Sequence, residues 1–301
     1  MPASIFKTSR LHIQSQSPPH SDHDTHPLNN EASITTTELT VLGKATVEDA
    51  ITARHIDVLS ILKAGSVRQN TAFKVDGKAT INSLQQVTEQ DTTDAPERDT
   101  PPNRIVINGD LTTHNIFNND EIESNGTAEI HDTLNSSDVH VDGALTLQNS
   151  LSCDHLNIKG SAKIQGTTDS STLTLQGEGV FDTLNCNELT GSGQLTAEQL
   201  STTTTDFTPS DTSRVDTLTG GRITIHTQSD NPQSQPNGHL KCTQIRGTTV
   251  ILEATTAETI IADSITLHED SSATTVYTNN LTTTANATVD ATYPLQDAPT
   301  R

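Results

Sequence analysis

Five glycines recur at a constant spacing of 17 residues in the middle of the chain, and this repeat constrains the fold more than any other feature. They are Gly109, Gly126, Gly143, Gly160 and Gly177. Counted from the aliphatic residue four places before each glycine, the odd positions of a repeat hold mainly small or apolar residues, and the even positions are mainly polar. This alternation predicts short β-strands, each with one buried face.

A repeat of this length cannot bury an apolar face alone, so successive repeats must stack and supply one another's core. The sequence therefore predicts an all-β fold, a short-coil β-solenoid with about 17 residues per coil, extruded loops and flexible tails. A third apolar point near position thirteen, as at Phe117 and Leu134, predicts a triangular coil. At the fifth position a side chain would crowd the corner or demand a positive φ, and glycine avoids both penalties.

The same register runs through the earlier part of the chain from Leu39. Glycine returns at the fifth position as Gly43 and Gly77, with Ser60 between them. We expect the first and third positions of these coils to form the core and, being near one end of the stack, to take part in polymerisation. These residues are Leu39, Val41, Ile56, Val58, Phe73 and Val75.

Breaks in the repeat divide the chain into six segments. A proline-rich, charged stretch over 86–103 is either a loop extruded from one coil or a domain linker, and the loop is favoured because the coils on both sides share one pattern. The stretches 201–214 and 227–239 are interpreted as further loops. The predicted segments are a flexible tail over 1–35, first coils over 36–85, the loop or linker over 86–103, a regular core over 104–200, irregular coils over 201–290 and a tail over 291–301.

Composition excludes several classes of protein. Hydrophobic residues make up 31% of the chain and aromatic residues 2%, which is too little for a conventional globular core but enough for a thin solenoid. The net charge of −21 makes nucleic acid an unlikely partner. Three widely spaced cysteines without a CxxC pair favour a reducing compartment. With no apolar run typical of a secretory signal, we expect a cytoplasmic protein.

One outward column of the repeat contains two histidines, His114 and His131, separated by 17 residues. If the assigned register is right, they lie on adjacent coils with backbones about 5 Å apart. A pair of histidines without further ligands is a weak metal site, so we expect two solvated rings.

No motif of an enzyme accompanies the repeat. The chain has no nucleophile elbow, phosphate-binding loop or HExxH sequence. A six-residue step from Ile105 to Leu111 and Phe117 is typical of hexapeptide acyltransferases, but their coils have about 18 residues, and the constant 17 departs from that. An acyltransferase is thus the least favoured alternative, and we expect no catalysis, no cofactor and no metal.

Three segments carry a resemblance to a known family. The sequences LTVLGKATV (39–47), VHVDGALTLQ (139–148) and LNIKGSAKIQG (156–166) resemble the bactofilins, a family of bacterial polymer-forming cytoskeletal proteins. The resemblance covers about residues 39–200. It implies a right-handed parallel β-helix, nucleotide-free assembly into filaments, and association with the inner face of the membrane through a short N-terminal segment, for which Ile5 and Phe6 are the candidates. The interruption at 86–103 and the loose repeats after 200 depart from the family pattern.

The open ends of a solenoid also favour self-association. A solenoid ends in a coil whose backbone groups and apolar interior face nothing, and such an edge recruits another copy. The leading hypothesis is a self-associating structural scaffold, a bactofilin-like filament subunit whose main partner is a second copy joined end to end. The alternative is a surface-exposed solenoid, an adhesin or fibre protein.

Overall fold

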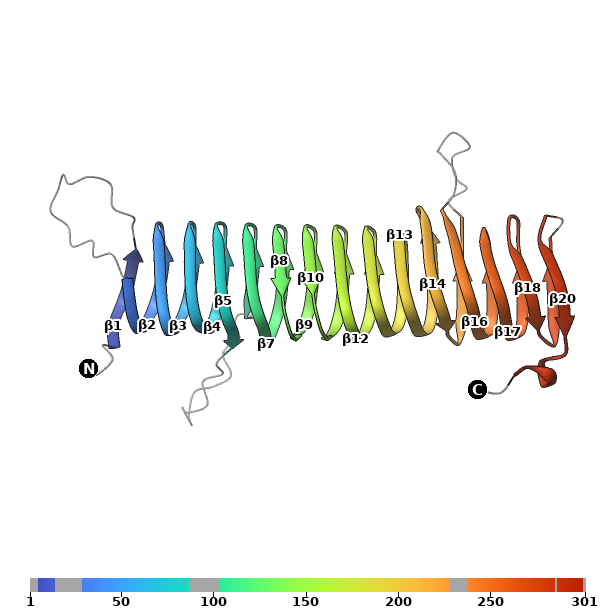
Figure 1. Cartoon of the computed structure of the whole chain (residues 1–301), viewed down its shortest axis with the longest axis horizontal. Coiled ribbons are helices and arrows are strands. Elements are labelled where there is room, and N and C mark those ends of the chain that lie inside the picture. Colours follow the sequence, from blue (N-terminus) through green and yellow to red (C-terminus); the bar gives the residue numbers. More distant parts are fainter. Residues whose placement is uncertain (1–4, 14–28, 87–102, 228–237, 285, 300–301) are drawn as a thin grey trace, which may run out of the picture. The chain divides into compact units, whose positions relative to one another are not determined.

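The computed structural model describes residues 5–13, 29–86, 103–227, 238–284 and 286–299, which fall into two compact units, Met1–Cys153 and Asp154–Arg301. Each unit is a stack of coils made of parallel strands (Figure 1). The predicted β-solenoid is confirmed. Each strand pairs with its equivalent one coil away along the chain, as β3 does with β4 and β16 with β17.

The strands of the first unit range from four to 15 residues. They are β1 (Ile5–Ile13), β2 (Asn29–Val41), β3 (Lys44–Val58), β4 (Ile61–Val75), β5 (Lys78–Gln86), β6 (Arg104–Ile107), β7 (Asp110–Ser124), β8 (Thr127–Ile130), β9 (Leu134–Val141) and β10 (Ala144–Leu147). Strand β11 (Leu151–Ile158) runs across the boundary.

The second unit continues with nine strands and one short helix. They are β12 (Ser161–Leu175), β13 (Glu178–Pro209), β14 (Thr212–Thr219), β15 (Arg222–Ile225), β16 (His239–Leu252), β17 (Thr255–Leu267), β18 (Ser272–Tyr277), β19 (Asn280–Thr283), β20 (Thr288–Tyr293) and the 3-10 helix η1 (Leu295–Asp297).

The register reproduces the sequence period in the first unit and explains its loss in the second. Lys44 pairs with Ile61 and Leu111 with Ala128, each 17 residues apart. In the second unit the same step takes 18 residues from Thr196 to Arg214 but 15 from Leu240 to Thr255. Coil length varies there while the pairing stays parallel. A fixed spacing therefore disappears from the sequence although the fold continues.

The core is one layer of aliphatic side chains inside each coil. All six predicted core residues of the first coils are buried: Leu39, Val41, Ile56, Val58, Phe73 and Val75. Neighbouring coils place like side chains above one another, as with Ile56 and Phe73. Burial of apolar area stabilises the fold by about 25 cal/mol per Å². Because similar side chains stack on one another, part of this stabilisation comes from contacts between neighbouring coils.

Crowding explains the corner glycines. A Cβ built on Gly126 would lie 2.2 Å from the carbonyl oxygen of Gly109, and one on Gly109 would lie 2.0 Å from that of Gly77. Of the two expected reasons for glycine, close approach applies here. Among the described glycines a positive φ occurs only at Gly191, with a value of 116°.

The predicted N-terminal tail over 1–35 is partly wrong. Residues 5–13 form β1, which pairs in parallel with β2, and β2 itself begins at Asn29. Leu11 pairs with Leu39 and Ile13 with Val41, so β1 continues the repeat by one further partial coil. The five-residue step from Phe6 to Leu11, also seen from Leu134 to Val139, was the available signal.

Two other expected irregular segments contain regular structure. The stretch 201–214, predicted as a loop, is occupied by the end of β13 and the start of β14. Its threonines are β-branched and suit a strand, and Thr205 and Phe207 point into the core. Near the C-terminus, β20 extends to Tyr293 and η1 follows, within the predicted tail 291–301.

The interruption at 86–103 lies within one coil. Strand β5 pairs directly with β7, with Lys78 opposite Asp110, and β4 pairs with β6, with Ala72 opposite Arg104. The coils on both sides therefore stack directly on each other, which is what a loop extruded from one coil requires. Residues 87–102 themselves lie outside the described residues, as do residues 228–237 of the loop predicted at 227–239.

We predict that Gly126→Ala destabilises the first unit by roughly 1–3 kcal/mol, because the added methyl group would force two stacked coils apart. The melting temperature followed by circular dichroism measures this. Ser60→Ala is the control, since Ser60 occupies the same repeat position with a Cβ already present, and it should change stability by less than about 0.5 kcal/mol. Equal melting temperatures for Gly126→Ala and the wild type would contradict the crowding argument.

Candidate assembly surface

The last coil of the second unit ends in an open sheet edge. Among the described residues, β19 pairs only with β17, and β20 only with β18. The other edge of both strands presents backbone N–H and C=O groups without a strand partner. Such an edge is a template for pairing with another chain.

The interior of this last coil is also incompletely covered. Leu281 stacks on Ile265, and Val289 stacks on Ala273. The two inner residues are 0% and 4% exposed, whereas Leu281 and Val289 are only half-buried. Within the described part of the chain, their apolar side chains have a neighbouring coil on one side alone.

The segment that follows does not supply the missing coil. Helix η1 contacts β17 and β18, and its residues are not buried. Arg246 on β16 donates a hydrogen bond from Nη2 to the carbonyl oxygen of Pro299 at 2.9 Å. Arg246 lies in register with Ile261, Tyr277 and Tyr293 on successive coils, so the segment after Tyr293 runs back toward earlier coils.

The first unit has the corresponding edge at β1. Among the described residues this strand pairs only with β2. Leu11 is half-buried, whereas its partner Leu39 is 1% exposed. Because β1 lies over Leu39 and Val41, those two residues are interior, and the terminal surface that we expected at them belongs to β1 instead.

The candidate membrane residues Ile5 and Phe6 lie in β1. Their backbones pair with Ser33 and Ile34. They therefore belong to a strand of the stack that is paired in register with β2. The expectation of a free N-terminal segment does not hold for these two residues.

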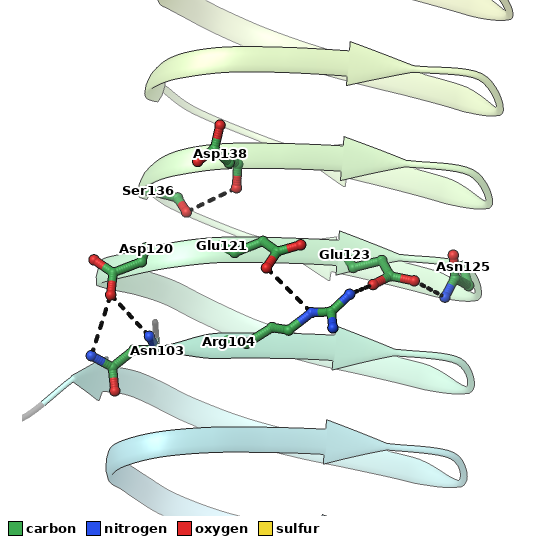
Figure 2. A network of polar contacts seen from close by, with 8 residues as sticks. All are labelled: Asn103, Arg104, Asp120, Glu121, Glu123, Asn125, Ser136 and Asp138. Carbon is green, nitrogen blue, oxygen red and sulfur yellow. Dashed lines mark hydrogen bonds and ion pairs between the residues drawn. The ribbon is translucent and has the colours of Figure 1, made fainter. Parts of the chain in front are cut away.

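A polar network ties β6, which follows the interruption, to β7 on the next coil (Figure 2). Arg104 of β6 forms ion pairs with two carboxylates of β7, Glu121 at 3.4 Å and Glu123. Asn125 donates a hydrogen bond to Glu123 at 2.7 Å. Hydrogen bonding by Asn125, together with the Arg104 charge, lowers the pKa of Glu123.

The network continues to the coil before the interruption. Asn125 also donates to Asn108 at 3.0 Å, and Asn108 donates to Asp76 at 2.7 Å. Lys74 completes it with an ion pair to Asp76 at 2.8 Å. Hydrogen bonds from Lys74 and Asn108 hold the pKa of Asp76 below its ordinary value. Three coils are thereby joined on their outer face.

The chain is anchored where it re-enters the stack. The backbone N–H of Asn103 donates to Oδ2 of Asp120 at 2.9 Å, and the backbone N–H of Asp120 donates to the carbonyl oxygen of Asn103 at 3.2 Å (Figure 2). Beneath this corner, buried Gln69 donates to Oδ1 of Asn119 at 3.0 Å. These contacts hold the coil closed despite its extra residues.

One corner of the first unit exposes three aliphatic side chains. Leu42, Leu59 and Ile61 are 44%, 48% and 39% exposed. Ile61 lies in register between Lys44 and Lys78, both exposed. We call these five residues the basic apolar corner. Sequence reasoning missed it, although the fourth and sixth repeat positions are polar in most other coils.

The predicted histidine pair is present. The rings of His114 and His131 lie 5.5 Å apart between centroids, as the assigned register requires. His131 also lies 3.8 Å from Glu129. No group of three or more metal-ligating side chains occurs among the described residues, and this pair alone is a weak site.

The cysteines have an interior position. Cys153, Cys186 and Cys242 are buried, and they form no disulfide. Burial raises the pKa of Cys186 and of Cys242 to about 12, which suppresses the reactive thiolate. The described part of the chain also contains no helix that is long and apolar enough to span a membrane.

Comparisons with known proteins identify no relative: no family model, no curated protein and no solved structure matches this chain.

The network in Figure 2 gives a prediction about acid stability. Because the pKa of Glu123 is lowered in the folded protein, its carboxylate contributes stability above the unfolded value of about 4.3, and this contribution is lost as the pH falls through the folded value. Glu123→Gln should flatten the loss of melting temperature between pH 5 and pH 3. The difference should stay below about 1 kcal/mol, since the pair is partly exposed. Parallel pH curves for variant and wild type would contradict the assignment.

Proposed function

We propose that this protein is a structural scaffold whose copies join end to end through the open edges of their solenoid coils. The observation that carries the proposal is the last coil, in which β19 and β20 are paired on one side only and Leu281 and Val289 are half-buried. A second copy that added a strand to each would satisfy the backbone groups and cover both side chains.

The energetic reason is that an edge is the one part of a solenoid whose interactions are incomplete. Every interior coil is paired on two sides and shares its core with two neighbours. An end coil keeps half of these contacts. The outer faces of the coils are polar and often charged, so the edges offer the larger gain on association.

We further propose that the scaffold is a bactofilin-like cytoskeletal filament in the cytoplasm. It is supported by the three sequence segments that resemble the family and by the 17-residue coils. A surface-exposed fibre or adhesin is the alternative. Fractionation of cells treated with external protease separates the two. A surface adhesin is cleaved, whereas a cytoplasmic scaffold is protected.

We predict that Leu281→Asp abolishes assembly, because a carboxylate would be buried without a partner at the junction. Negative-stain microscopy and sedimentation of the purified chain measure this. Thr282→Asp is the matched control, since it adds the same charge to the neighbouring, exposed residue of β19 and should leave assembly intact. Wild-type protein that stays monomeric at all concentrations would overturn the proposed function.

The basic apolar corner supports a second element of function, reversible attachment to an anionic membrane. Aliphatic side chains flanked by lysines are the composition of interfacial membrane contacts. Leu59 and Ile61 expose apolar area beside Lys44 and Lys78, whereas the chain as a whole is strongly acidic. One copy would bind weakly, and an assembly would bind through many such corners.

We predict that the assembled protein sediments with vesicles that contain phosphatidylglycerol but not with pure phosphatidylcholine vesicles. The double variant Lys44→Gln, Lys78→Gln should reduce binding at least about tenfold, since each lysine near the surface contributes about 1 kcal/mol. Lys163→Gln, an exposed lysine of the second unit, is the control and should bind like the wild type. Equal binding by the double variant would assign attachment to another surface.

A further inference from the structure

We propose that residues 294–299 form a strap that holds the last coil in place from its outer side and so keeps the β19–β20 edge ready for pairing. We call this segment the C-terminal strap. The role of the edge rests on the proposed function. The holding action of the strap concerns a single copy, so it can be measured without assembly.

The last coil has few contacts of its own. Strands β19 and β20 have four and six residues, and their inward residues Leu281 and Val289 are only half-buried. An interior coil has two neighbours, whereas this coil has one within the described part of the chain. A segment with few buried apolar contacts opens locally at a small cost in free energy. Without further contacts, this edge would fray before a second copy could pair with it.

A column of side chains runs along the outside of the coils that end the second unit. Its members lie in register on β16, β17, β18 and β20, and they are Arg246, Ile261, Tyr277 and Tyr293. We call these four residues the outer strip. The rings of Tyr277 and Tyr293 stack with 5.4 Å between their centroids. Ile261 follows the inner residue Ile260, so its side chain points away from the core.

Ile261 is buried although its side chain points outward. It is 6% exposed, whereas Ile61, another outward isoleucine, is 39% exposed. The difference is explained by the strap, because its helix η1 contacts β17 and β18. Leu295 and Ala298 of the strap are half-buried, although the other residues from 294 to 299 are exposed. Apolar residues of the strap therefore cover the apolar part of the outer strip.

Arg246 holds the far end of the strap. Its Nη2 donates a hydrogen bond to the carbonyl oxygen of Pro299 at 2.9 Å. The strap therefore runs from the end of β20 back along the outer strip to β16. Strand β20 is joined to the strap at Tyr293, so this end of β20 cannot leave β18 unless the contacts of the strap are also lost. Opening of the last coil is thereby coupled to contacts on three earlier strands.

The strap leaves the edge itself open. Its contacts are with β16, β17 and β18, on the outer side of the coils. Among the described residues, no strand of this chain pairs with the other edge of β19 or β20. A capping segment would instead lie across the last coil and shield it from solvent. A strap on the outer side orders the last coil in advance, which lowers the entropy cost of pairing with a second copy.

Hydrogen exchange of the full chain, at concentrations where it is monomeric, tests the strap. Leu295→Asp places a charge where the strap meets β17 and β18, and it should raise the exchange rates of the β20 amides about five- to tenfold. Gln296→Asp is the matched control, since it adds the same charge to the neighbouring, exposed residue and should leave these rates unchanged. Equal rates for Leu295→Asp and the wild type would overturn the inference.

A second variant changes the other side of the same contact. Ile261→Thr removes apolar area from the outer strip but keeps a β-branched residue in the strand. It should also raise the exchange rates of the β20 amides. Because both residues act through one contact, the double variant with Leu295→Asp should exchange no faster than the more affected single variant. Fully additive effects would mean that the two side chains act separately, and they would overturn the strap.

The exchange data also set the expectation for assembly. Only copies with a closed last coil can pair through β19 and β20, so the concentration needed for assembly rises as the closed fraction falls. At the temperature where exchange shows half of the Leu295→Asp copies to be open, this concentration should be about twice that of Gln296→Asp. Sedimentation measures it.

The two readouts separate the strap from the proposed function. Faster exchange with an equal concentration for assembly would support the strap and contradict the β19–β20 edge as the junction. A wild-type chain that never assembles would overturn the scaffold function, and hydrogen exchange would still decide whether the strap holds the last coil.

Discussion

Parallel backbone pairing between consecutive coils is the interaction on which the rest of the structure depends. Each interior strand obtains its hydrogen bonds from the coil before and the coil after, as β3 does from β2 and β4. Because the ladder also stacks apolar side chains, an apolar column such as Leu39, Ile56 and Phe73 forms without any long-range matching of shapes. A chain with 2% aromatic residues can therefore fold, since its core is a repeated contact between neighbours.

The same ladder decides where the chain tolerates change. At the glycine corner, successive coils approach so closely that a Cβ on Gly143 would lie 2.2 Å from the carbonyl oxygen of Gly126, so most of the regular coils have glycine there, with Ser60 as an exception. At the corner near Asn103, the coil contains extra residues, yet β5 still pairs with β7. Asn103 and Asp120 close that coil through reciprocal hydrogen bonds. Insertions are accepted where the strands on both sides keep their partners.

The sequence predicted the coil, its length and its core because all three repeat, and repetition makes a weak alternation recognisable. It failed where a feature occurs once. Strand β1 contributes one partial coil, and β13 passes through the threonine-rich stretch after 200 without the aliphatic residues of the earlier repeats. The network around Arg104 was not predicted either, because it joins Asp76 to Glu123 through side chains that become neighbours only once the interrupted coil is closed. The histidine pair could be predicted because it depends on the 17-residue register alone.

The surface charge and the open sheet edges together support the proposed association through the edges. Outward positions carry most of the acidic residues, and with a net charge of −21 the sides of two copies repel each other. The edges are different, because their unpaired backbone groups are uncharged and their half-buried residues, Leu11 and Leu281, are aliphatic. Repulsion between the sides falls with added salt, whereas the gain from pairing an edge does not depend on charge in the same way. The edges are therefore the surfaces at which the proposed association would meet the least repulsion between like charges at low ionic strength.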